Sequence, residues 1–233
     1  MTRTVKPVHL IAGGDRRVRK GPNPLLEAAF AQAGSPRPSI AYIGVASDDD
    51  RGFFRWLTAI FQGAGAGDVR LARLASPRAD AAEARRILEV SDIVFVSGGD
   101  VEAGMAHLER HDLPPFLARL RRGGKPFFGL SAGSIMLARQ WVRWSDPDDD
   151  ASAEPFPCLG LAPIVCDTHA EADDWQELRV LLGLAGDAVG YGIPTGGALR
   201  VGADGSVVAL GRPAARLVSR AGRVAAADEM VVA

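Results

Sequence analysis

The sequence predicts an α/β fold with a mostly parallel central sheet, helices on both of its faces and a β-rich C-terminal part. Up to about residue 140, short apolar runs alternate with longer amphipathic stretches, which indicates parallel strands joined by crossover helices. The apolar runs are continuous, as expected for strands that are covered on both faces. Beyond residue 140, strand-like runs separated by glycine turns predominate.

Length and composition limit the classes of protein to consider. The chain has 233 residues, which at about 150 residues per domain allows one large domain or two small ones; because no change of composition marks a boundary, we expect a single domain over 1–233. With 27 basic and 28 acidic residues the net charge is −1, which argues against nucleic acid as a partner. No apolar run approaches the ~20 residues of a membrane span, and Met1–Leu10 is unlike a signal peptide. The two cysteines, Cys158 and Cys166, are too few for a disulfide framework and suggest reduced thiols in the cytoplasm.

The first half of the chain supplies the expected parallel strands and their crossover helices. The strands are the short apolar runs at 8–11, 39–45, 69–71, 92–96 and 126–130. One helix begins at Asn23-Pro24, where Asn is a favoured N-cap and Pro a favoured first residue. Further helices are expected over 50–62, 79–90, 113–122 and 134–139.

The second half begins with an acidic stretch, Ser145 to Glu154, that we interpret as a solvated loop, since it lacks the spacing of an EF-hand calcium loop. A strand over 161–166 and a helix over 173–182 follow. The remaining short strands are expected at 189–193, 198–201, 207–210, 215–219 and 224–226. Turns at Asp204-Gly205 and Ala221-Gly222 predict hairpins between some of them.

The strongest chemical signal is Gly129-Leu130-Ser131-Ala132-Gly133, which fits the G-x-S-x-G pattern between a strand and a helix. A nucleophilic serine has to stand clear of the sheet on a tight turn, and the two glycines allow neighbouring backbone to pass closely. The N–H of Ala132 can then point at a developing oxyanion. A plain glycine-rich turn is the alternative reading of the same pattern.

Another glycine turn, Ser97-Gly98-Gly99-Asp100, also follows a strand, and such strand ends form the site crevice in open parallel sheets. Gly99 can supply a second oxyanion N–H, although a simple turn is at least as common. The turn Ala12-Gly13-Gly14-Asp15 lacks the pattern of a phosphate-binding loop.

A serine nucleophile needs a base, and the chain has four histidines. His9 lies inside a strand, which favours a structural role, and His107 and His111 fall in or near a polar helical stretch, where we expect them to be solvated. His169 follows the strand over 161–166. If this strand is parallel to the others, His169 lies at the same sheet edge as Ser131 and is the best candidate base.

Taken together, the turns at 97–100, 129–133, Asp167-Thr168-His169 and Gly192-Ile193 resemble the dipeptidase E and cyanophycinase family of serine peptidases. Leu10-Ile11-Ala12-Gly13-Gly14 is similar to the cyanophycinase start. The resemblance implies a flavodoxin-like three-layer sandwich related to class I glutamine amidotransferases. Those enzymes use a cysteine at the elbow, so Ser131 argues against glutaminase chemistry.

The resemblance also implies roles for individual residues. Ser131 is the nucleophile, His169 the general base and then acid, and Gly99 and Ala132 provide the oxyanion N–H pair. The implied substrate is a small peptide such as an Asp-X dipeptide, or the aspartate–arginine polymer cyanophycin. No cofactor and no metal are expected. Asp100, and Arg179 as the nearest positive charge after His169, are candidate substrate-binding residues.

The sequence departs from the family pattern at the position of the triad acid, which falls on Thr195 within Gly192-Ile193-Pro194-Thr195. Thr195 is a possible third member of the triad, but it carries no charge. Loss of the triad carboxylate function costs on the order of 10⁴ in rate. Asp167, Glu171 and Asp173 are acids that can substitute for it.

Three functional interpretations follow. The first is an active serine peptidase, a monomer or a homodimer, acting without membrane or nucleic acid. The second is a catalytically impaired family member that binds a ligand or regulates, which Thr195 favours. The third is a lipase-like α/β-hydrolase; its usual order of nucleophile, acid and histidine would require an acid between Asp146 and Glu154.

Overall fold

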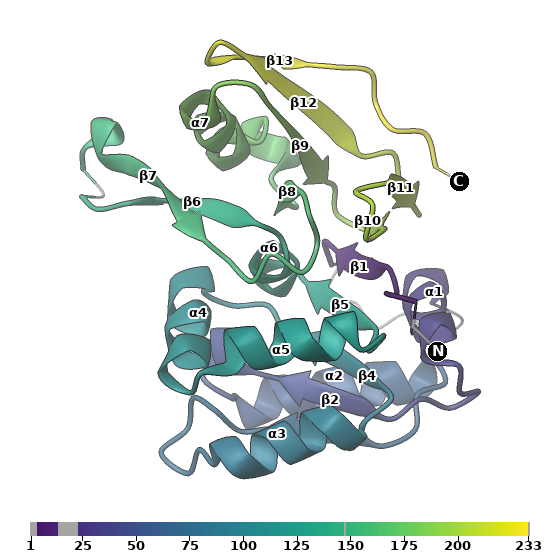
Figure 1. Cartoon of the computed structure of the whole chain (residues 1–233). Coiled ribbons are helices and arrows are strands. Elements are labelled where there is room, and N and C mark those ends of the chain that lie inside the picture. The colour runs from purple at the N-terminus through teal and green to yellow at the C-terminus, as the bar shows by residue number, and fades with distance from the viewer. Residues whose placement is uncertain (1–3, 14–22, 147, 233) are drawn as a thin grey trace.

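The computed structural model describes residues 4–13, 23–146 and 148–232 (Figure 1). In these ranges the main sheet has seven strands in the order β11-β10-β1-β5-β4-β2-β3. Its strands are β1 (Val8–Ile11), β2 (Ile40–Ile43), β3 (Val69–Ala72), β4 (Ile93–Val96), β5 (Phe127–Leu130), β10 (Ala198–Val201) and β11 (Val207–Leu210). The five neighbouring strands β1, β5, β4, β2 and β3 are parallel, whereas β10 and β11 join β1 as an antiparallel hairpin.

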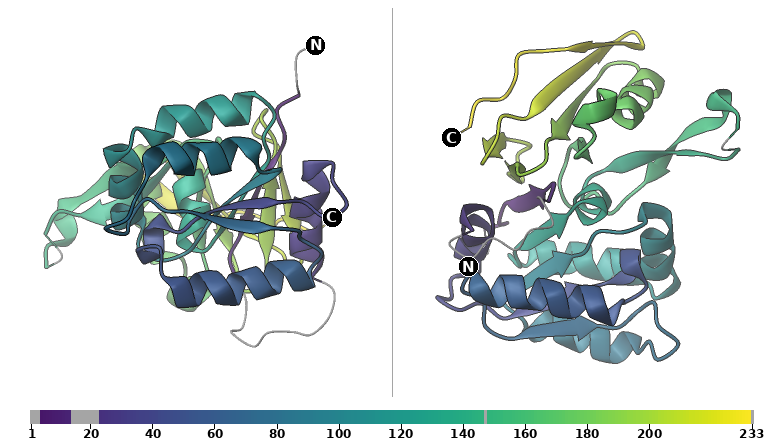
Figure 2. Two further views of the ribbon diagram at one scale, coloured as in Figure 1. Left: turned by 90° about the horizontal axis from the view of Figure 1, so that it is seen from below. Right: turned by 180° about the vertical axis from the view of Figure 1, so that it is seen from behind.

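Helices cover both faces of this sheet (Figure 2). One face is covered by α1 (Pro24–Phe30) and α2 (Arg51–Gly63). The other is covered by α3 (Ala81–Val90), α4 (Val101–Arg110), α5 (Leu113–Arg122) and α6 (Ala132–Leu137). The prediction of a three-layer α/β fold with a mostly parallel sheet is therefore confirmed.

The α1–α2 side of the sheet is packed by aromatic rings. The ring centroids of Phe61 and Phe128 lie 4.8 and 4.7 Å from that of Phe95. All three side chains are fully or almost fully buried, and Tyr42 and Phe30 pack against them. Each such ring pair contributes about 0.5–1.5 kcal/mol beyond its buried area, so this cluster fixes β4 and β5 relative to α2.

The C-terminal strands are divided between two sheets. In the described ranges a four-stranded sheet has the order β13-β12-β9-β8, with α7 (Gln176–Ala185) against it. Its strands are β8 (Val165–Thr168), β9 (Ala188–Ile193), β12 (Ala215–Arg220) and β13 (Arg223–Ala226). The expectation that His169 lies at the edge of the same sheet as Ser131 is wrong, because β8 pairs with β9 and not with the main sheet.

A hairpin of β6 (Gln140–Trp144) and β7 (Ala153–Pro157) flanks the acidic loop, and Figure 1 shows it projecting beside α6 and α7. Neither strand was predicted from the sequence, and Ala153 and Glu154, expected in the acidic loop, belong to β7. Pro155 and Pro157 obscured β7, since proline cannot donate to a ladder and is confined to edge positions. The β-favouring residues Trp141, Val142 and Trp144 were the available signal.

For α4 the sequence indicated only a polar helical stretch near His107 and His111, without bounds, whereas the remaining helices and strands agree with the prediction or move by a few residues. Both predicted hairpin turns join paired antiparallel strands, β10 with β11 and β12 with β13. β8 begins at Val165, four residues later than expected, and α7 begins at Gln176 because a 3₁₀ turn, η4 (Glu171–Asp173), precedes it. None of the helices in the described ranges is both long enough and apolar enough to cross a bilayer.

Candidate active site

Ser131 lies at the turn between β5 and α6 with φ 53° and ψ −126°. A side chain rarely adopts this backbone conformation, which costs about 1–3 kcal/mol and persists only where its surroundings enforce it. Here the Ser131 N–H donates to Ile11 O at 2.9 Å, and the Ser131 carbonyl accepts from Ser134 N–H at 2.7 Å. The strained turn is thus held by β1 on one side and by α6 on the other.

The glycines that flank Ser131 are required by close backbone contacts. A Cβ on Gly133 would lie 2.1 Å from Val96 O, and one on Gly129 would lie 2.6 Å from the carbonyl carbon of Gly133. Neither distance is compatible with a side chain. The close passage of backbone that the sequence analysis expected at Gly129 and Gly133 is confirmed.

The structure brings Ser131 and His169 together. Ser131 Oγ and His169 Nε2 are 2.7 Å apart, a hydrogen bond of the kind that links a nucleophile to its base. His169 directly follows β8 and has a φ of 47°. The backbone N–H of His169 donates to Ile193 O at 2.9 Å, so β9 fixes the backbone from which the imidazole projects.

The turn at 97–100 faces the elbow. A Cβ on Gly98 would lie 3.1 Å from Ser131 Cβ and 3.6 Å from its Oγ, which shows how closely the turn approaches the serine. Gly99 has a φ of 144°, and a Cβ there would lie 1.7 Å from Ala46 O. Within the described ranges, neither the N–H of Gly99 nor that of Ala132 has a hydrogen-bond acceptor.

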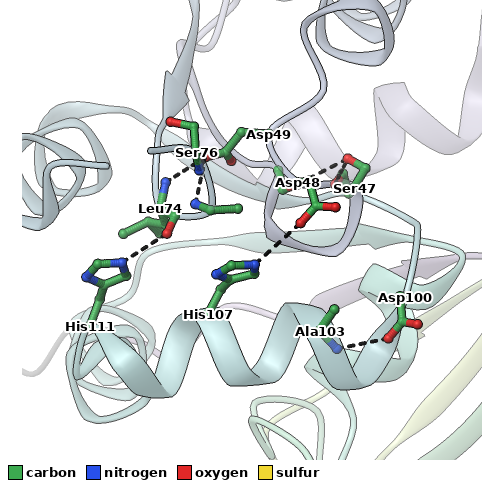
Figure 3. Close-up of polar contacts among 12 residues, drawn as sticks. Ser47, Asp48, Asp49, Leu74, Ser76, Asp100, Ala103, His107 and His111 are labelled. Atoms are coloured by element: carbon green, nitrogen blue, oxygen red, sulfur yellow. Dashed lines mark hydrogen bonds and ion pairs between the residues drawn. The ribbon is translucent and has the colours of Figure 1, made fainter. Parts of the chain in front are cut away.

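The contact between Gly99 and the loop after β2 was missed by the sequence analysis. That loop includes η2 (Val45–Ser47), and Ala46 O accepts from Asp100 N–H at 2.7 Å. The carboxylate of Asp100, a candidate for substrate binding, caps α4 by accepting from Ala103 N–H at 2.9 Å (Figure 3). Gly44, which ends β2 with a turn, was the available signal.

The expectation that His107 and His111 are solvated is wrong, because both make polar contacts with other parts of the chain (Figure 3). His107 Nε2 lies 3.4 Å from a carboxylate oxygen of Asp48, and His111 Nε2 lies 2.9 Å from Leu74 O. Both side chains are half-buried and tie the α4 end to the loops after β2 and β3. His9 is buried in β1, as expected, and burial lowers its pKa to about 4.

Thr195, the possible third member of the triad, contacts Glu171. Its N–H donates to Glu171 Oε1 at 3.1 Å, and in the described part of the chain no hydrogen bond joins it to His169. Burial acts to raise the pKa of Glu171, but hydrogen bonds from its own backbone and from Thr195, and the charge of His169, leave it below its ordinary value. The structure therefore places a carboxylate within electrostatic reach of His169.

Two arginines lie on this side of the site. Arg179 lies in α7 and its side chain is held by Asp174, just before this helix: it donates to Asp174 O at 2.7 Å and pairs with the Asp174 carboxylate at 2.9 Å. Arg212 donates to Thr195 O at 3.2 Å and is exposed. Arg212 was not predicted from the sequence, because no motif connects it to Thr195.

Asp167 is a buried acid two residues before His169. Its side chain is 5% exposed; Oδ1 accepts from Thr168 N–H at 2.7 Å, and Oδ2 has no partner among the described residues. Burial, reinforced by the charges of Glu177 and Asp173, raises its pKa to about 7. The carboxylate thus gains a proton near neutral pH.

This shift predicts a pH dependence of stability. Because the ordinary pKa of 3.8 rises to about 7 on folding, the folded state holds a proton that the unfolded state has released between these pH values. The group therefore lowers the free energy of unfolding as pH rises through this window, by about 1.4 kcal/mol per pH unit and a few kcal/mol in all.

We expect Asp167→Asn to raise the free energy of unfolding, relative to the wild type, by a few kcal/mol more at pH 8 than at pH 4. Urea unfolding of both proteins at both pH values measures this difference. His9, whose pKa is lowered to about 4, produces the opposite trend in both proteins, so the difference between variant and wild type isolates Asp167. The same stability difference at both pH values would contradict the assignment.

Comparison with known proteins gives the family. The family model for peptidase family S51 matches residues 9–208. The chain belongs to peptidase family S51. The match includes both glycine turns, the serine elbow and His169, and it agrees with the resemblance to dipeptidase E described above.

Curated relatives match segments of this S51 chain. Peptidase E of Streptomyces coelicolor is 34% identical over 82 residues, covering 35% of this chain and 33% of the relative. The pyridoxal 5'-phosphate synthase subunit PdxT of Methanopyrus kandleri is 35% identical over 77 residues, covering 33% of this chain and 38% of PdxT. The aligned segments thus span little more than a third of these relatives' length.

The fold is shared along the whole chain. The crystal structure of a peptidase from an acI-B1 Actinobacterium superposes with a TM-score of 0.72 at 15% identity, covering 97% of this chain and 99% of that one. At such low identity this match shows a common fold and says nothing about the substrate.

Proposed function

We propose that this chain is a serine peptidase that hydrolyses a small peptide through an acyl-enzyme on Ser131. The hydrogen bond of 2.7 Å between Ser131 Oγ and His169 Nε2, on a strained elbow, carries the proposal. It supplies the nucleophile and base in direct contact, which is the geometry this chemistry requires.

In the proposed reaction His169 Nε2 takes the proton of Ser131 Oγ as the oxygen attacks the peptide carbonyl. The tetrahedral oxyanion accepts hydrogen bonds from the N–H groups of Gly99 and Ala132. The C–N bond then breaks, and the imidazolium of His169 protonates the leaving amine. A water molecule, deprotonated by His169, cleaves the ester and releases the acid, and the proton returns to Ser131.

We propose that Glu171 takes the place of the missing triad acid as a positioning residue. The hydrogen bond from Thr195 fixes one carboxylate oxygen, and the negative charge favours the imidazolium that forms on His169. On this proposal Thr195 acts through Glu171. It places the acid in the 3₁₀ turn that begins two residues after His169, in place of the expected position near residue 195.

Glu171→Gln is expected to lower kcat about 10- to 100-fold with little change in KM, because it removes charge near the imidazolium and not a substrate contact. Steady-state hydrolysis by both proteins measures this split. Asp173→Asn is the matched control on the same turn. The Asp173 carboxylate accepts from the N–H groups of Trp175 and Gln176 at the start of α7, and its replacement should change kcat less than about 3-fold. Equal effects of the two substitutions would contradict the role of Glu171.

For the substrate we propose a small peptide with an acidic residue beside the scissile bond, such as an Asp-X dipeptide. Arg212, which donates to Thr195 O, is a candidate to bind the acidic side chain of the substrate, and Arg179 and Asp100 remain candidate substrate-binding residues. Amine release from Asp-Leu, Asn-Leu and Ala-Leu tests the preference. Faster cleavage of Asp-Leu supports it, and equal rates on all three contradict it.

The alternative is a family member that binds a ligand without efficient turnover, and the uncharged Thr195 favours it. The two functions differ in whether Ser131 reacts covalently. For the cellular setting we propose the cytoplasm, where the two free thiols Cys158 and Cys166 remain reduced. We propose a monomer or homodimer, since none of the chemistry described here requires another chain.

A further inference from the structure

Two adjoining hollows of about 280 and 270 Å³ lie between the start of α2 and the edge strand β3, away from Ser131. Both are lined by Arg51, Leu71 and Arg73; Arg78 lines the first and Arg55 the second. Together they form a groove, called here the arginine groove, that brings four guanidinium groups to one surface.

The lining of the arginine groove has a positive excess, because it includes four arginines and one carboxylate, that of Asp49. In the described part of the chain none of its four arginines forms a salt bridge. Glu83, which Arg73 reaches electrostatically, is already bound bidentately by Arg86 at 2.6 and 2.7 Å.

The two aspartates nearest the groove are also occupied, by backbone groups. Asp49 Oδ2 accepts from three successive N–H groups, Leu74, Ala75 and Ser76 (Figure 3), at 2.8, 2.8 and 3.2 Å. Asp50 caps α2 by accepting from Phe53 N–H at 2.6 Å. Hydrogen bonds from N–H groups do not cancel the charge of a carboxylate, so this surface carries four guanidinium groups against these two carboxylates, a positive excess.

The start of α2 adds to this potential. A helix N-terminus is favoured by negative charge, yet the first turn of α2 contains Arg51 and no acidic residue. By contrast, α1, α3, α4 and α7 each carry a glutamate there. At the start of α2 the carboxylate of the N-cap, Asp50, faces the helix dipole without a glutamate in the first turn, and an anion bound beside Arg51 would offset the guanidinium charge.

The shape of the arginine groove favours an extended ligand. It continues across two hollows, and its floor includes the apolar side chains of Phe54 and Leu71. β3 ends the main sheet, so within the described ranges its outer backbone groups have no partner strand. A peptide can use guanidinium, apolar and backbone contacts together, whereas a small phosphate uses only the first.

We propose that the arginine groove binds the acidic segment of an extended peptide. The chain as a whole has a net charge of −1, so attraction of a polyanion has to come from this local cluster. The proposal concerns binding alone and does not require turnover at Ser131.

The test uses the full chain carrying Ser131→Ala, which prevents cleavage by Ser131 if the proposed peptidase activity is present. Fluorescence anisotropy measures the binding of a labelled octapeptide of alternating Glu and Ala, with a Gln/Ala peptide for comparison. We expect the acidic peptide to bind at least about 10-fold more tightly, and its affinity to fall as NaCl rises from low to physiological concentration.

Arg51→Gln/Arg73→Gln is expected to weaken binding of the acidic peptide about 10-fold, because two guanidinium–carboxylate contacts are lost. Arg216→Gln/Arg220→Gln removes the same charge from exposed positions on β12 of the other sheet and should change affinity less than about 2-fold. Equal weakening by both pairs, absence of binding at 1 mM peptide, or displacement by an equal concentration of inorganic phosphate would overturn the proposal.

Discussion

Ser131→Ala is expected to lower kcat/KM for peptide hydrolysis by on the order of 10⁴ or more, with the fold retained. The side chain supplies the attacking oxygen, and its Oγ makes the hydrogen bond to His169. Alanine keeps the Cβ that the strained turn already accommodates. The measurement is amine release from Asp-Leu, together with thermal unfolding of both proteins.

His169→Ala should cost about as much, and the double variant no more than either single one, because nucleophile and base act as a unit. Ser145→Ala is the control, since this serine lies in the exposed loop of the β6–β7 hairpin and its side chain, among the described residues, hydrogen-bonds only to Ser152 O. If the losses of the single variants multiplied in the double variant, the two residues would not form one catalytic unit.

Gly133→Ala is expected to destabilise the protein by about 3 kcal/mol or more and to lower Tm by about 10 °C. The added Cβ would lie 2.1 Å from Val96 O and 2.6 Å from Ser97 O, and neither β4 nor α6 can move without disturbing the elbow. Differential scanning calorimetry measures the change. Because Ser97 precedes the Gly98-Gly99 turn, the activity should fall as well.

Gly63→Ala is the matched control. Gly63 is the last residue of α2, and a Cβ there meets nothing within 4 Å. Alanine should leave stability unchanged or raise it by up to about 1 kcal/mol, because glycine is the poorer helix former. A Gly133→Ala protein as stable as the Gly63→Ala protein would show that β4 and α6 do not pack as described.

The sequence predicted the elbow well because its requirements are local. A nucleophile on a turn between β5 and α6 needs small neighbours, and Gly129 and Gly133 stand at the necessary spacing. Asn23 and Pro24 marked the start of α1 for a similarly local reason, since the Asn23 side chain accepts from Leu26 N–H. Signals of this kind lie within a few adjacent residues.

Features that depend on distant pairings were not predictable in the same way. The apolar run before His169 did not reveal that β8 pairs with β9 in a separate sheet. The contact between Glu171 and Thr195 spans 24 residues and follows from that second sheet. The arginine groove likewise joins α2 to the loop after β3, and only the fold brings these segments together.

The most direct test of the central claim is intact mass after reaction with a small fluorophosphonate, which bonds to an activated serine oxygen with loss of fluoride. We expect one adduct on the wild type, and none on Ser131→Ala or His169→Ala in the same time. Labelling that persists in Ser131→Ala, or a folded wild type that remains unlabelled, would contradict the claim that His169 activates Ser131.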